Sequence, residues 1–128
     1  MGSDTPLAIS RLLRAPRALV YQAFTDPDHL LAWWGPVGNS LLREEMDFDV
    51  RPGGYQRWTE IRPAQPDLRV RVEFSLTAVK DCELLDGVMR VDRHLKGSRL
   101  ESFTSRLRVE FYEDGATRTR LEIRQWLP

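Results

Sequence analysis

Few residues in this 128-residue chain could do acid, base or metal chemistry. His29 and His94 are the only histidines, and neither belongs to a cluster with the spacing of metal ligands. His29 follows Asp28 in what should be the first turn of a helix, where an exposed polar residue is ordinary. The sequence therefore predicts no catalytic residue, no metal site and no cofactor.

The remaining reactive or charged groups also have simple structural explanations. Cys82 is the single cysteine and has no histidine near it in sequence, so a small core thiol is a better interpretation than a nucleophile. Asp47 and Asp49 share one strand face, which a solvated or ion-paired sheet surface explains. Gly53 and Gly54 serve a turn, because no helix follows them to bind a phosphate.

The aromatic residues are more informative, beginning with two adjacent tryptophans in "TDPDHLLAWWGP" at 25–36. A helix turns by about 100° per residue, so Trp33 and Trp34 cannot both point into one core. If Leu30 and Trp34 face the core, Trp33 lies toward the rim of whatever the sheet encloses. Core packing explains any single ring better than ligand contact does, whereas a shared apolar pocket explains the whole set equally well.

The strand containing "YQRWTE" carries large aromatic groups on both faces, since Trp58 alternates with Tyr55 and Arg57. Arg57 is the candidate for the polar group that orients a ligand. The predicted ligand-binding residues are Trp33, Trp34, Tyr55, Arg57, Trp58 and Phe74.

The elements that must position these side chains begin with a strand and two short helices. Residues 7–14 alternate as a strand, and the apolar stripe after Pro16 has helical spacing. Asp26 and Pro27 are an N-cap and first-turn pair for a second helix, which Gly35-Pro36 should end.

The rest of the chain predicts strands joined by tight connections. Alternation over 45–51 and the turn "RPGG" lead into 55–62, and residues 68–77 give the clearest half-buried strand. Residues 80–96 fit either a helix or a strand, and Gly87 favours a turn and a strand. Two long strands, 103–111 and 121–127, form a terminal hairpin. This order predicts an α+β fold with an antiparallel sheet and the helices at one side.

The overall composition excludes several kinds of partner. The 19 basic and 19 acidic residues balance, which favours neither nucleic acid nor an anionic membrane as a partner. No apolar run approaches the roughly 18 residues that span a bilayer, and the N-terminus lacks a signal-peptide layout. We therefore expect a single domain over 1–128 in the cytoplasm.

Three pieces of the sequence together resemble the heat-shock-chaperone ATPase activator homologue-like family of the START / birch-allergen-like (SRPBCC) superfamily. They are "APRALVYQAFTDPDHLLAWWGPVG", "DFDVRPGGYQRW" and "DGATRTRLEIRQ". The resemblance implies a helix-grip fold, in which a curved antiparallel sheet wraps around a long C-terminal helix and encloses a cavity. Residues 64–106 match the family pattern poorly, and the chain ends at Pro128, before the long helix that the resemblance implies.

Three functions follow as hypotheses. The first is binding of a small apolar or aromatic molecule in the cavity. The second is a protein-interaction module that contacts a chaperone, as the family name suggests. The third is a cyclase or hydrolase on the same scaffold, which ranks last because no acid/base pair is positioned.

Without a long helix, part of the apolar sheet face needs another cover. The residues expected on that face are Met46, Phe48, Val70, Val72, Phe74, Leu107, Val109, Phe111, Leu121 and Ile123. Leaving about 400 Å² of it in water would forgo on the order of 10 kcal/mol, comparable to the whole stability of a small domain. Either residues 80–100 fold back as a lid, or the chain forms a two-fold homodimer.

Overall fold

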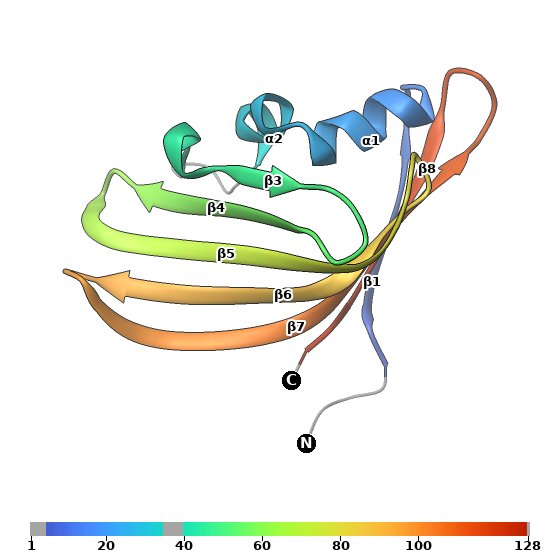
Figure 1. Ribbon diagram of the computed structural model, residues 1–128. Helices are drawn as coiled ribbons and strands as arrows, with labels where there is room; N and C mark the ends of the chain where they lie inside the picture. The colour runs from blue at the N-terminus through green and yellow to red at the C-terminus, as the bar shows by residue number, and fades with distance from the viewer. Residues whose placement is uncertain (1–4, 35–39, 128) are drawn as a thin grey trace.

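The computed structural model of the chain describes residues 5–34 and 40–127. It contains one eight-stranded antiparallel sheet in the order β1-β8-β7-β6-β5-β4-β2, with β3 also paired to β4. The sheet curls into a half-barrel around two helices, α1 and α2 (Figure 1). The strands are β1 (Leu7–Leu13), β2 (Ser40–Leu41), β3 (Asp47–Asp49), β4 (Tyr55–Arg62), β5 (Gln65–Lys80), β6 (Leu84–Leu95), β7 (Ser98–Glu113) and β8 (Thr119–Trp126). The predicted α+β helix-grip class is confirmed.

The two helices follow β1 as predicted. Helix α1 (Arg17–Thr25) begins after Pro16, whose fixed φ suits a helix start. Helix α2 (Pro27–Trp33) has Asp26 as its N-cap, and the Asp26 carboxylate accepts hydrogen bonds from the backbone N–H groups of Asp28 and His29. The predicted stop at Gly35-Pro36 lies outside the described residues. A short 3₁₀ helix, η1 (Arg43–Glu45), precedes β3.

The region that the sequence left ambiguous is a strand. Residues 84–95 form β6, which pairs with β5 and β7, so the proposed lid over 80–100 is wrong. Gly87 does not make a turn, because it lies inside β6, opposite a register shift between Leu76 and Ala78 of β5. The turn comes earlier, at Asp81–Glu83, where Cys82 has a positive φ of 60°.

Gly87 allows two neighbouring strands to approach closely. A Cβ atom on this residue would lie 1.9 Å from the carbonyl oxygen of Ser75 on β5. No larger residue fits at this backbone position without moving one of the strands. The requirement for glycine here therefore comes from sheet packing rather than from a turn.

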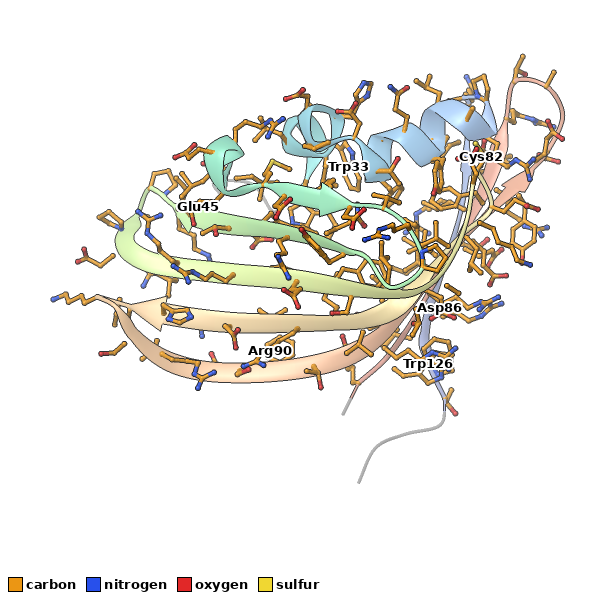
Figure 2. All side chains as sticks on the ribbon, viewed as in Figure 1. Trp33, Glu45, Cys82, Asp86, Arg90 and Trp126 are labelled. Atoms are coloured by element: carbon orange, nitrogen blue, oxygen red, sulfur yellow. The ribbon has the colours of Figure 1, made fainter. Side chains whose placement is uncertain are left out.

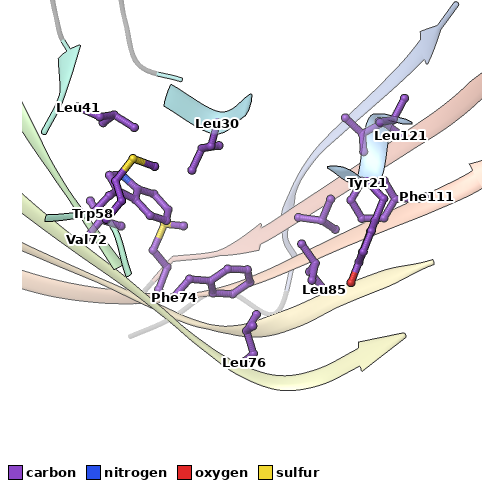
Figure 3. Packing of buried hydrophobic residues seen from close by; sticks show 14 of the residues in the cluster. Tyr21, Leu30, Leu41, Trp58, Val72, Phe74, Leu76, Leu85, Phe111 and Leu121 are labelled. Carbon is purple, nitrogen blue, oxygen red and sulfur yellow. The ribbon is translucent and has the colours of Figure 1, made fainter. Parts of the chain in front are cut away.

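The core lies between the concave face of the sheet and the helices (Figure 3). The residues predicted for the covered face divide into a fully buried group, Met46, Val70, Val72, Phe74, Val109, Phe111 and Leu121, and a partly buried group, Phe48, Leu107 and Ile123. The helices, η1 and the curl of the sheet thus cover more of this face than two short helices were expected to cover. Within the described residues, no helix is long and apolar enough to cross a membrane.

Candidate ligand-binding cavity

A cavity of about 330 Å³ lies between the helices and the concave face of the sheet. Figure 3 shows Leu30 of α2 above Trp58 of β4 and Phe74 of β5, and all three residues line the cavity. The alternation of each strand directs one set of side chains to the concave face, and so the cavity draws on five neighbouring strands. Its lining residues are Phe24, Leu30, Trp34, Gln56, Trp58, Phe74, Leu85, Met89, Leu107, Val109, Ile123 and Gln125.

A continuous chain of aromatic rings crosses the helix side of the cavity. Phe24 meets Trp33 at 4.9 Å between ring centroids, Trp33 meets Trp34 at 5.6 Å, and Trp34 meets Trp58 at 5.2 Å. Each contact is edge-to-face, the arrangement that the ring quadrupoles favour. This row of rings joins both helices to β4 and forms an aromatic wall.

The polar groups that line the cavity are neutral amides. Gln56 is only 3% exposed, and its Nε2 donates to the carbonyl oxygen of Phe24 at 2.7 Å. Gln125 Nε2 donates to the Ser105 hydroxyl at 2.9 Å. Each glutamine therefore uses one of its two amide N–H groups on the protein, which leaves its Oε1 acceptor and its second N–H.

Glu60 holds the two tryptophans that line the cavity. Its Oε1 accepts from the indole Nε1 of Trp34 at 2.6 Å and from that of Trp58 at 3.5 Å. Since an indole N–H can only donate, a carboxylate between the rings satisfies both. Glu60 itself does not line the cavity, so its carboxylate positions the two indole rings rather than contacting the cavity.

The structure brings together only some of the predicted ligand-binding residues. Trp34, Trp58 and Phe74 line the cavity. Trp33, labelled in Figure 2, lies at the rim, as predicted: the residue is 45% exposed, and its Nε1 donates to the Ala23 carbonyl. It borders a separate apolar groove along α1.

Tyr55 and Arg57 are placed on the other side of the sheet. They lie on the convex face, where the Arg57 guanidinium stacks 3.7 Å from the Tyr55 ring centroid and bonds to Glu73. The expectation that Arg57 orients a ligand in the cavity is therefore corrected, because residues 55 and 57 alternate with the residues that face the cavity.

Groups suited to acid, base or metal chemistry do not gather at the cavity. Burial and the nearby carboxylate of Asp81 raise the pKa of the Cys82 thiol, which disfavours a thiolate. His29 is exposed on α2, and His94 lies near the far end of β6. In the described part of the chain, no three His, Cys or acidic residues are grouped to hold a metal ion.

The sequence pattern of the activator of Hsp90 ATPase homolog 1-like proteins matches residues 14–126. The chain belongs to this family. A comparison with curated proteins gives no match.

Solved bacterial structures share the fold of this family member. A Chromobacterium violaceum protein superposes with a TM-score of 0.72 at 18% identity, over 97% of this chain and 81% of the other. A Nitrosomonas europaea protein gives 0.74 at 19% identity, over 97% and 76%. A Silicibacter pomeroyi AHSA1 protein gives 0.70 at 20% identity, over 94% and 78%.

Sequence reasoning missed several residues that define the cavity of this AHSA1-like chain. Phe24, Gln56 and Gln125 were not predicted as site residues, although each carries a signal. Phe24 lies on the apolar stripe of α1, and Gln56 adjoins Tyr55 on the opposite face of β4. Gln125 continues the alternation of Leu121 and Ile123 on β8, which indicates a polar group at a concave position.

Proposed function

We propose that this protein binds a small, neutral, apolar or aromatic molecule in the cavity between α2 and the sheet. The observation that supports this most strongly is the lining, which joins an aromatic wall to two amide groups and, among the residues that the structure describes, contains no charged side chain. The volume of about 330 Å³ is at the lower end of the range of about 300–1,000 Å³ for ligand pockets, which suits a compact ligand.

The polar groups of the cavity suit a ligand that carries a hydroxyl or a ring N–H. Gln56 and Gln125 each use one amide N–H on a protein group, which leaves an Oε1 acceptor and a second N–H for a ligand. A hydroxyl or ring N–H on the ligand would satisfy such an acceptor. A ligand carboxylate would lose its hydration and meet no cation on the lining, which makes an acidic ligand unfavourable.

Calorimetric titration with two matched probes tests this function. We expect 2-naphthol to bind with saturation, and 2-naphthoate, which has a carboxylate in place of the hydroxyl, to bind at least about tenfold more weakly. Saturable binding of neither probe, or equal binding of both, would contradict the proposal.

A cavity-filling variant with a matched control locates the site. Leu107 of β7 lines the cavity, so Leu107→Trp should abolish 2-naphthol binding. Val88 of the neighbouring strand β6 is exposed on the convex face, and Val88→Trp should leave the affinity unchanged. Loss of binding in both variants, or in neither, would place the probe elsewhere.

A further inference from the structure

One edge of the sheet is open along a whole strand. β1 pairs with β8 on one side over all seven residues, from Leu7 opposite Gln125 to Leu13 opposite Thr119, without a bulge. On its other side, within residues 5–34 and 40–127, no backbone group is hydrogen-bonded to β1. Among the described residues, the side-chain hydrogen bond to its main chain is from the Arg11 guanidinium, which donates to the neighbouring Ser10 carbonyl.

The two edges of this sheet are protected differently. The opposite edge ends in β2, which has only two residues, and η1 and β3 lie beside the same strand β4. Very short strands, prolines, bulges, lysines and inward-pointing charges are among the features that keep an edge from pairing. Between Leu7 and Leu13, β1 contains no proline, lysine or bulge, and Arg11 on the concave face is its one charged residue.

β1 also exposes apolar side chains on both of its faces. Leu7 is 60% exposed and Ile9 46% exposed on the concave face, and Leu12 is 54% exposed on the convex face. A strand laid along this edge would cover side chains on both faces at once. An open edge with apolar residues on both faces is a template for another strand.

We propose that β1 is a dimerisation strand, which pairs antiparallel with β1 of a second copy of this chain around a two-fold axis. A strand edge meets its own hydrogen-bonding pattern under such an axis, so no different partner sequence is required. With Ser10 on the axis, Leu7 lies opposite Leu13 of the partner subunit and Ala8 opposite Leu12 of the partner subunit.

The same register avoids opposing like charges. Arg11 lies opposite Ile9 of the partner subunit, where the aliphatic part of the arginine can cover the apolar side chain while its head group stays in water. In the dimer, the Ser10 carbonyl would accept a hydrogen bond from a backbone N–H of the partner strand in place of the bond from the Arg11 guanidinium. Because a single strand pair buries less surface than a standard interface, we expect dissociation in the micromolar range or above.

Sedimentation equilibrium on the full chain, from about 1 µM to about 1 mM, tests the proposal. We expect a monomer–dimer equilibrium, and we expect Leu7→Lys/Leu12→Lys to raise the dissociation constant at least about tenfold. Leu100→Lys is the matched control, because Leu100 is also 54% exposed but lies on β7 near the far hairpin. This control should dimerise like the unaltered chain.

Hydrogen exchange on the unaltered chain makes the test independent of the variants. Amides of β1 should exchange more slowly at high protein concentration than after dilution, whereas those of the other edge strand, β2, should not change. A monomer at every concentration would overturn the proposal, even if it binds an added strand peptide. A dimer that the β1 lysines leave intact, or that Leu100→Lys weakens equally, would overturn it as well.

Discussion

Adjacent residues divide the roles at the cavity. Trp34 lines the cavity, and Trp33 packs against the Trp34 ring from the rim. This division is expected from the rotation of about 100° per helical residue. For β4, the alternation of side chains was not enough to assign the residues that face the cavity. Alternation shows that Trp58 faces away from Tyr55 and Arg57, but not which set faces the helices. That choice depends on the pairing of β4 with β5, which no single strand reveals.

Asp86 is a buried, ion-paired carboxylate on the convex face, where Figure 2 also places Trp126. It is 6% exposed, and it accepts from Arg108 at 2.7 Å and from Arg106 at 3.1 Å. Burial would raise the pKa of this carboxyl, but the hydrogen bonds from Arg106 and Arg108 outweigh burial and lower it. The folded protein therefore favours the carboxylate.

The lowered pKa of Asp86 predicts a pH-dependent contribution to stability. A carboxyl with a lowered folded-state pKa stabilises above its unfolded pKa of about 4, and this stability is lost as the pH falls through the folded-state value. Asp86→Asn should thus lower the free energy of unfolding by about 1–3 kcal/mol at neutral pH, toward the lower end because Arg106 is half exposed. Urea denaturation of both proteins measures the difference, which should shrink below pH about 4. A difference that is constant with pH would contradict this assignment.

At the scale of elements, Gln56 ties α1 to the sheet. The Phe24 carbonyl lies in the last turn of α1, where helix carbonyls lack a partner within the helix, and Gln56 Nε2 fills that need. Gln56→Leu should lower the free energy of unfolding by about 1–3 kcal/mol, since the buried carbonyl loses its donor. The exposed Gln22 on α1 is the control, and thermal unfolding should show almost no effect of Gln22→Leu. Equal effects would show that Gln56 holds nothing in place.

The strand crossing at Gly87 gives a second prediction for the elements. Gly87→Ala should lower the free energy of unfolding by about 3 kcal/mol, because its Cβ would meet the Ser75 carbonyl oxygen. Gly97 has φ +83° and open space around it, so Gly97→Ala should cost only about 1 kcal/mol of backbone strain. Chemical denaturation of both variants measures the two costs. A smaller loss at Gly87 than at Gly97 would contradict the packing explanation.

The sequence predicted the elements better than their relations. The strands at 68–77, 103–111 and 121–127 and the Asp26 cap were readable, since alternation and capping are local signals. The close approach at Gly87 was not readable, because it depends on Ser75 of another strand. For this reason Gly87 was interpreted from the sequence as part of a turn.

For the whole molecule, curvature decides how much of the sheet is covered. From the sequence, two short helices were expected to cover only part of the apolar sheet face. The half-barrel instead wraps around α1 and α2, and the ten predicted face residues are all buried or partly buried (Figure 1). The exposed apolar residues of β1 remain at one edge, so the proposed dimer rests on an edge strand rather than on the whole face.

Binding in the cavity is the central claim, and the indole N–H signals of the protein test it most directly. A ¹H–¹⁵N NMR titration with 2-naphthol can follow these signals separately, once single Trp→Phe variants assign them. We predict saturable shifts for Trp34 and Trp58, which line the cavity, and no shift for Trp126, which stacks with Arg106 on the convex face. The absence of a saturable shift at Trp34 and Trp58, or an equal shift at Trp126, would contradict the account.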